Sequence, residues 1–166
     1  MMKRLEIVSV FEQYDAISEL PEKDRNLLMA AKKAAESAYA PYSNFHVGAA
    51  VLLENGVVVS GNNQENAAYP SGLCAERVAM FYAGAQYPGV PVKAVAITAF
   101  SPDFKITEPV GPCGACRQSM VEYENRYKTN IRVLLMDDNG KVIVTDTLKS
   151  YLPLLFSSEN LKRKIS

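Results

Sequence analysis

The chain has 166 residues, which suits one domain that buries about two-thirds of its unfolded surface. Its 18 Lys and Arg residues balance 18 Asp and Glu residues without a long basic cluster, so nothing is arranged to neutralise a run of phosphates, and we expect no nucleic-acid partner. No apolar stretch approaches the roughly eighteen residues of a membrane span, and the charged start is unlike a signal peptide, so we expect a cytoplasmic protein with no membrane partner.

The N-terminal segment, residues 1–23, is predicted to be an arm or extension that precedes a single domain over residues 24–166. Apolar residues alternate loosely between residues 5 and 10, a pattern that favours a strand or an extended arm. The pattern alone assigns the segment no role.

The first helix is predicted from Asp24 to just before Pro41, because it has an acidic start and proline disfavours helical backbone in the residue before it. Its apolar stripe consists of Leu27, Ala31, Ala34, Ala35 and Ala38. Two apolar runs follow, joined by Asn55 and Gly56, which is the strongest short-range signal for a tight hairpin. The first two strands of the domain are therefore expected to be antiparallel.

Helices and strands alternate in the second half of the chain. Ser71 is the expected N-cap of a second helix through "LCAERVAMFYAGA", and the buried-looking strand "VKAVAITAF" comes next. Pro112 has the place of a first helical residue, so a third helix is predicted from Cys113 to about Tyr123. The strands "IRVLLM" and "KVIV" follow, joined by the turn "DDNG".

The central strands are apolar on both faces, which indicates a sheet that is covered on both sides. The fold class is therefore α/β: a three-layer α/β/α sandwich with a mixed five-stranded sheet.

The cysteines carry the strongest functional signal. In a reducing cytosol a disulfide is disfavoured, so the C-x-x-C pair of Cys113 and Cys116 indicates metal or redox chemistry. Cys74 opens the second predicted helix and the pair opens the third, and helix N-termini favour thiolates, which suit Zn²⁺ at this spacing. The sole histidine, His46, lies in another segment. Three protein ligands with water as the fourth predict a catalytic zinc site.

Glu76 is the candidate base beside this site, although a glutamate in a first helical turn is commonly there for the helix dipole. Residues two apart on a helix face opposite sides, so Cys74 and Glu76 share a site only if the zinc lies beyond the helix end. Arg77 and Arg117 are either solvated helix charges or hydrogen-bond donors that temper the thiolates.

Four motifs together resemble cytidine deaminase of the three-cysteine, free-nucleoside type: "PYSNFHVGAAV", "GNNQENAAY", "CAERVAM" and "PCGACRQ", within about residues 38–156. The resemblance implies hydrolytic deamination of cytidine and 2′-deoxycytidine to uridine or deoxyuridine plus ammonia. It implies one Zn²⁺ per subunit, held by Cys74, Cys113 and Cys116, and a zinc-activated water with Glu76 as proton shuttle.

The resemblance also implies how the nucleoside is bound. Phe45 matches the aromatic residue that packs against the pyrimidine, and the backbone N–H of Ala75 matches a contact to the ring carbonyl. Asn63 and Glu65 match the residues that contact the ribose.

Two more aromatic residues, Tyr69 and Phe156, match residues that approach a neighbouring subunit's site in homotetrameric members of the family. A homotetramer is therefore expected. Residues 1–23 have no assigned counterpart, and the stretch "SPDFKITEPVG" before Cys113 is somewhat extended.

Four alternatives compete with this interpretation. A deaminase of bases in nucleic acid uses the same zinc chemistry, but the balanced charge and the short "DDNG" link argue against it. A deaminase of another small aminopyrimidine compound would not need the ribose contacts of Asn63 and Glu65. A zinc-binding interaction module needs a fourth protein ligand, and a thiol redox protein needs Cys113 and Cys116 free of metal.

Overall fold

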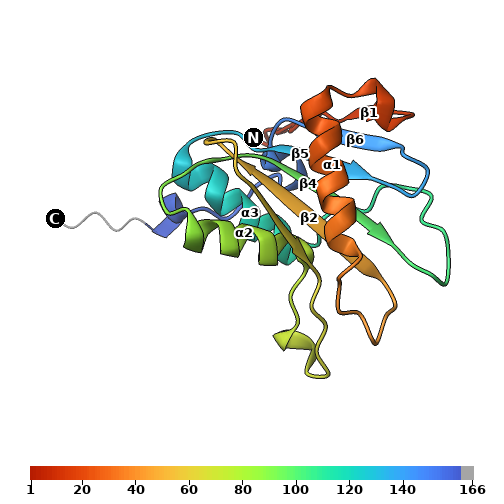
Figure 1. Cartoon of the computed structure of the whole chain (residues 1–166). Coiled ribbons are helices and arrows are strands. Elements are labelled where there is room, and N and C mark those ends of the chain that lie inside the picture. The colour runs from red at the N-terminus through yellow and green to blue at the C-terminus, as the bar shows by residue number, and fades with distance from the viewer. Residues whose placement is uncertain (162–166) are drawn as a thin grey trace.

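The centre of the molecule is a six-stranded mixed sheet in the order β1-β6-β5-β4-β2-β3, with helices on both faces (Figure 1). The computed structural model describes residues 1–161, so residues 162–166 of the predicted domain lie outside the described part. The three-layer α/β/α class with a mixed sheet is confirmed. The expected count of five strands is wrong by one.

The predicted hairpin is present. β2 (His46–Leu53) pairs antiparallel with β3 (Val58–Asn62), and Gly56 in the turn has a φ of 84°, a left-handed conformation that glycine adopts without steric cost. β2 also pairs antiparallel with β4 (Val92–Phe100), which puts it in the interior of the sheet. This explains why β2 is apolar on both faces.

The second half of the sheet contains a parallel pair. β4 pairs parallel with β5 (Arg132–Met136), and α3 (Gly114–Tyr127) makes the crossover between them. β5 then pairs antiparallel with β6 (Val142–Thr145) through a short turn, as "DDNG" predicts. No helix intervenes between β5 and β6.

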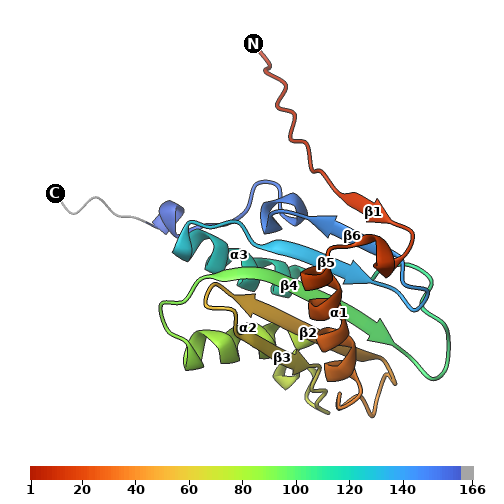
Figure 2. The ribbon, with the colours of Figure 1, turned by 45° about the horizontal axis from the view of Figure 1, so that its top comes forward.

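The sixth strand is β1 (Glu12–Tyr14), which pairs antiparallel with β6 at the edge of the sheet (Figure 2). A strand or an extended arm was predicted for residues 5–10; no strand forms there, and β1 begins just after them. The register explains this: Glu12 lies opposite Val144, one residue before the end of β6 at Thr145, so residues before Phe11 run past that end. Residues 1–11 are exposed.

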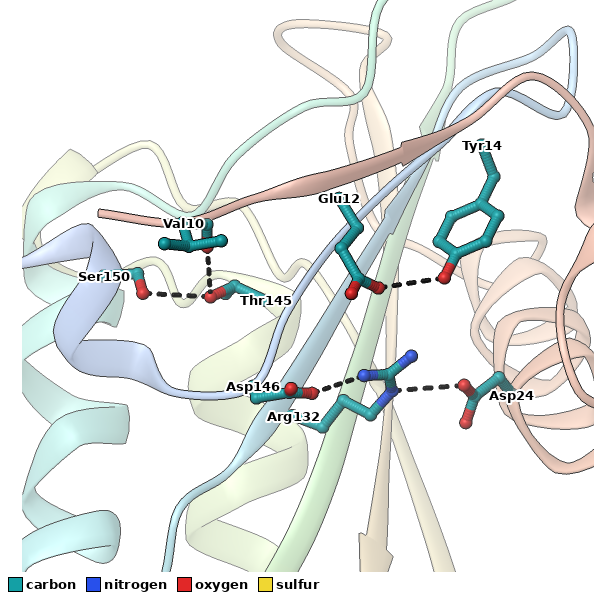
Figure 3. Close-up of polar contacts among 8 residues, drawn as sticks. All are labelled: Val10, Glu12, Tyr14, Asp24, Arg132, Thr145, Asp146 and Ser150. Atoms are coloured by element: carbon teal, nitrogen blue, oxygen red, sulfur yellow. Dashed lines mark hydrogen bonds and ion pairs between the residues drawn. The ribbon is translucent and has the colours of Figure 1, made fainter. Parts of the chain in front are cut away.

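Arg132 connects this edge of the sheet to the first helix (Figure 3). Its Nε donates to Asp24 Oδ2 at 3.1 Å, and its Nη1 donates to Asp146. Asp24 is 4% exposed and lies in the first turn of α1 (Glu22–Ala35). The start of α1 is thereby tied to β5 and to the segment after β6.

α1 covers one face of the sheet, while α2 (Ala75–Gln86) and α3 cover the other (Figures 1 and 2). α1 ends at Ala35, earlier than predicted. Gly48 allows α1 to pack closely, because a Cβ there would lie 2.0 Å from the Ala31 carbonyl oxygen. A side chain at Gly61 would likewise lie 2.5 Å from the Ala79 nitrogen of α2. Glycine at this position lets the N-terminal half of α2 lie directly on β3.

Within residues 1–161, none of the helices has the length and apolar character that crossing a bilayer requires.

Candidate active site

The three cysteines form a cluster at the start of α2 and α3. Their Sγ atoms lie within 4.8 Å of one another, with Cys74 and Cys113 3.9 Å apart and Cys113 and Cys116 3.4 Å apart. Two sulfur ligands of a tetrahedral zinc, each about 2.3 Å from the ion, are about 3.8 Å apart. The cluster therefore fits one zinc ion without a large rearrangement.

Each helix begins directly after a cysteine. Cys74 and Cys113 are the N-cap residues of α2 and α3, both have extended backbones, and neither side chain makes a capping hydrogen bond. Their thiols are therefore free to bind a metal. Cys116, in the first turn of α3, is fully buried and supplies the third thiol of the cluster.

The helix starts differ from the prediction in detail. Ser71 is not the N-cap of α2, because it ends a short 3-10 helix, Tyr69–Ser71. The backbone of Leu73 then pairs with Gln64 in both directions, at 2.8 and 2.9 Å, which keeps this stretch out of the helix. Pro112 likewise precedes the N-cap Cys113 and is not a helical residue.

The pKa values of Cys74 and Cys116 are shifted in opposite directions. The hydrogen bond from the Cys116 thiol lowers the pKa of Cys74, and Arg77 lowers it further, since Arg77 Nη2 donates to Cys74 Sγ at 3.9 Å. Donation to Cys74, together with burial, raises the pKa of Cys116. Cys74 is thus the first of this pair to become a thiolate.

Glu76 lies beside the cluster at the second residue of α2 and is 4% exposed. Burial raises the pKa of its carboxyl group. Because Cys74 precedes the helix, the two side chains are not forced onto opposite faces, and both line the same cavity. This is the arrangement that a zinc beyond the helix end requires.

A cavity of about 670 Å³ opens in front of the cluster. The predicted site residues that line it are Phe45, Asn63, Glu65, Tyr69, Cys74, Glu76, Arg77 and Cys113. Ala75 and Cys116 are fully buried, whereas Arg117 and Phe156 lie outside this lining. The structure thus brings together most residues that the motifs singled out.

Asn63 connects the cavity to the start of β2. Its Oδ1 accepts from the backbone N–H of Val47 at 2.8 Å, and its Nδ2 donates to the carbonyl of Phe45 at 2.9 Å. An amide has a second N–H and a second lone pair, so Asn63 can still bind a ligand. Its position is fixed before a ligand arrives.

Glu65 is held by the loop before β2. Its carboxylate accepts from the backbone N–H of Tyr42 at 2.9 Å, from the backbone N–H of Ser43 at 3.3 Å, and from the Ser43 hydroxyl. The Ser43 hydroxyl is the main reason that the pKa of Glu65 is lowered. The role of Ser43 could not be predicted from the sequence, because it depends on a contact across 22 residues.

Phe45 forms one wall of the cavity, and a second aromatic residue that sequence analysis missed supports it. The ring of Phe104 stacks on Phe45, with centroids 6.3 Å apart and planes 20° apart. Asn44 donates to Asp103 at 2.9 Å, which ties the same two loops together. The extended stretch before Cys113 therefore lies against the loop that carries Phe45.

Arg77 and Arg117 play different parts. Arg77 contacts the Cys74 sulfur, as predicted for a donor to a thiolate. Arg117 instead donates from Nε to the Pro112 carbonyl at 2.7 Å and from Nη1 to the Tyr151 carbonyl at 3.3 Å. Both hydrogen bonds go to backbone carbonyls and not to sulfur.

Tyr69 and Phe156 are exposed, at 81% and 56%. Tyr69 lines the mouth of the cavity, whereas the Phe156 carbonyl accepts from Gln118 Nε2 at 3.0 Å. Whether either side chain reaches a neighbouring subunit's site stays a prediction.

Three cysteines around one metal position, with a buried glutamate beside them on a helix-covered mixed sheet, define an enzyme of the zinc-dependent deaminase type. A family model described as "Cytidine and deoxycytidylate deaminase zinc-binding region" matches residues 21–131. The chain belongs to the cytidine and deoxycytidylate deaminase family, as its motifs predicted, and zinc is its cofactor.

Individual relatives agree. The chain is 43% identical over 136 residues to a cytidine deaminase of Sporosarcina psychrophila, which covers 81% of this chain and 92% of the relative. It is 42% identical over 139 residues to one of Halalkalibacterium halodurans, covering 83% and 98%. A crystal structure of cytidine deaminase from Burkholderia pseudomallei matches with a TM-score of 0.71 and 41% identity, over 82% of this chain and 100% of that one.

Proposed function

We propose that the protein hydrolyses cytidine and 2′-deoxycytidine to uridine and deoxyuridine with release of ammonia. One observation carries the proposal: one cavity of about 670 Å³ is lined by Cys74 and Cys113 of the cysteine cluster, by the buried Glu76, and by the polar pair Asn63 and Glu65. The cavity is large enough for a nucleoside. The names of the relatives support the same substrate.

In this proposal Cys74, Cys113 and Cys116 hold zinc, which when bound supplies the Lewis acidity that makes a water nucleophilic near neutral pH. Glu76 moves the protons. It takes one proton from the attacking water and gives it to N3 of the base. It then takes the remaining proton from the hydroxyl that the water leaves on C4 and gives it to the exocyclic amine, which departs as ammonia as the C4 carbonyl forms. The raised pKa of Glu76 suits a group that must both accept and release a proton.

The remaining cavity residues orient the nucleoside. Phe45 packs against the pyrimidine, and the backbone N–H of Ala75, at the first residue of α2, donates to the ring carbonyl. Asn63 and Glu65 bind the ribose hydroxyls. The carboxylate of Glu65 repels a phosphate, which favours a nucleoside over a nucleotide.

Arg77 and Arg117 act on the metal ligands. Arg77 tempers the charge of the thiolates through its contact with Cys74. Arg117 fixes the backbone at Pro112, next to Cys113.

We further propose a cytoplasmic homotetramer in which Tyr69 and Phe156 close the site of a neighbouring copy. The C-terminal segment supports this proposal, because Leu154 and Phe156 are 82% and 56% exposed although both are apolar. A chain truncated before Tyr151 is expected to lose both the tetramer and cytidine binding, as sedimentation and a binding titration would show.

The direct β5–β6 hairpin argues against nucleic acid as substrate, since it leaves no helix between these strands.

The main experiment compares substrates. Zinc is measured per chain, and the fall in ultraviolet absorbance is followed with cytidine, 2′-deoxycytidine, free cytosine and single-stranded DNA. Turnover of the two nucleosides alone is expected. Turnover of cytosine but not cytidine favours another aminopyrimidine substrate, and comparable turnover of DNA contradicts the proposal.

A further inference from the structure

The N-terminal arm contacts the C-terminal segment at the edge of the sheet (Figure 3). The Thr145 hydroxyl lies 3.0 Å from the Val10 carbonyl oxygen and 2.9 Å from the Ser150 hydroxyl oxygen. A hydroxyl has one proton, so Thr145 donates to Val10 and accepts from Ser150. The arm is thus linked through β6 to the 3-10 helix Leu148–Tyr151.

The next residue of the arm, Phe11, packs on Tyr151. The two rings meet edge to face, with centroids 5.0 Å apart and planes at 68°. The guanidinium carbon of Arg117 lies 5.4 Å from the centroid of the Tyr151 ring, within the range of a cation–π contact. Arg117 Nη1 also donates to the Tyr151 carbonyl at 3.3 Å. Tyr151 therefore contacts both the arm and Arg117.

Arg117 carries this contact to the metal cluster. Its Nε donates to the carbonyl of Pro112 at 2.7 Å, and its backbone N–H donates to the carbonyl of Cys113 at 2.9 Å. The second bond is the ordinary helical bond at the start of α3, so the side chain of Arg117 acts on the backbone beside Cys113 through its bond to Pro112. This cysteine is exposed and is an N-cap residue, so backbone contacts, not burial, determine where its sulfur lies.

We propose that Phe11 is a positioning residue for the metal site: through Tyr151 and Arg117 it holds the backbone at Pro112 and Cys113 and slows the loss of zinc. The inference rests on the cysteine zinc site of the proposed function, but not on the substrate. The arm precedes the region that the family model matches, which begins at residue 21, so the zinc site of this chain is supported by a segment outside that region.

The expected effect is modest because Phe11 acts through two other residues. Changing a direct partner of a metal ligand commonly costs about ten- to a hundredfold in metal affinity, so we expect Phe11→Ala to speed zinc release by about three- to tenfold. The lost aromatic contact is the physical cause.

The experiment measures the release of zinc from the purified full chain into a chromogenic chelator, at a temperature well below unfolding. Phe11→Ala is compared with Leu5→Ala, which removes an apolar side chain from the same arm at a position that is 74% exposed. Phe11→Tyr keeps the ring and, since Phe11 is 42% exposed, leaves its added hydroxyl access to water. Absorption spectra of the cobalt-substituted proteins report the geometry of the thiolates.

Faster zinc release and an altered cobalt spectrum in Phe11→Ala, with parent behaviour in Leu5→Ala and Phe11→Tyr, support the proposal. In a Tyr151→Leu background, Phe11→Ala is expected to add no further change, because the contact has already been removed. Parent-like zinc release in Phe11→Ala overturns the proposal, and so does an equal effect in Leu5→Ala. A parent protein that holds zinc but does not deaminate cytidine contradicts the proposed function and leaves this inference standing.

Discussion

Two buried glutamates lie on the helices that carry the cysteines, and their surroundings differ. Glu124, on α3, is 1% exposed; it accepts from the backbone N–H of Leu148 at 2.8 Å, from that of Ile131 at 3.3 Å, and from the Thr147 hydroxyl. Glu76, on α2, is 4% exposed and lines the cavity, and burial raises its pKa despite hydrogen bonds from its own backbone N–H and from Cys116.

The different surroundings indicate a structural role for Glu124 and a catalytic role for Glu76. Glu124 satisfies fixed donors from segments on either side of β5 and β6, so its carboxylate joins them to α3. Glu76 faces a cavity that a substrate can enter, and its raised pKa brings it nearer to neutral pH. We therefore expect Glu124 to determine stability and Glu76 to determine turnover.

The largest expected effect is on turnover. Glu76→Gln removes the proton carrier, and general acid/base catalysis commonly contributes about 10²- to 10⁴-fold, so kcat is expected to fall by about that factor. Zinc content and thermal unfolding should stay near those of the parent, since the amide has the same shape. Near-normal kcat in a folded, zinc-loaded Glu76→Gln sample assigns the proton transfers to another group.

The matched change at the other glutamate should affect stability. Glu124→Ala leaves two buried backbone N–H groups and a hydroxyl without their acceptor, which is expected to lower the free energy of unfolding by about 3 kcal/mol. Glu124→Gln should cost about 1 kcal/mol, because the amide oxygen can still accept from both N–H groups. Urea unfolding measures both. Loss of kcat in folded Glu124→Gln at unchanged stability contradicts the comparison.

Glu65 gives a third, intermediate test, because it lines the cavity but is bound by the loop before β2. Glu65→Gln weakens a hydrogen bond to a charged acceptor, so KM for cytidine is expected to rise about tenfold, with a smaller change in kcat. Binding of uridine, measured by calorimetry, should weaken by a similar factor. An unchanged KM removes Glu65 from ribose binding.

The smallest effect concerns pH. In the parent, the Ser43 hydroxyl lowers the pKa of Glu65, so the carboxylate keeps its charge to a lower pH than an unperturbed glutamate does. Its contribution is present above the ordinary glutamate pKa and is lost as the pH falls through the lowered pKa. Ser43→Ala should therefore raise the pH below which binding of uridine weakens, as calorimetry over a pH series measures. Weakening at the parent's pH contradicts the role of Ser43.

Short-range sequence patterns predicted those parts of the site whose residues lie close together in the sequence. Cys113 and Cys116 are close in sequence, and the spacing between Cys74 and Glu76 is local, so the cluster and its glutamate were predictable. The role of Glu124 was not, because its partners Ile131 and Leu148 come from other segments and a glutamate inside "VEYENRY" is typical of a solvated helix face.

Long-range pairing also explains the errors in the fold. Serine is a residue type favoured at N-caps, but the pairing of Gln64 with Leu73 keeps the residues after Ser71 extended, so the helix begins later in the sequence. The sixth strand was missed because Glu12–Tyr14 is short and polar and gains its conformation only by pairing with β6. The β-propensity of a segment depends on its own residues alone, whereas a short edge strand forms only when a neighbouring strand pairs with it.

The pairing of β1 with β6 has a consequence for the order of synthesis. Residues 142–144 leave the ribosome only after about 130 further residues have followed their partners at residues 12–14. The hairpin of β2 and β3, and β4 beside it, involve short separations and can form while translation continues. Until β6 is released, residues 12–14 have no strand to pair with. Closure of this edge of the sheet therefore follows formation of the β2–β3 hairpin on the nascent chain.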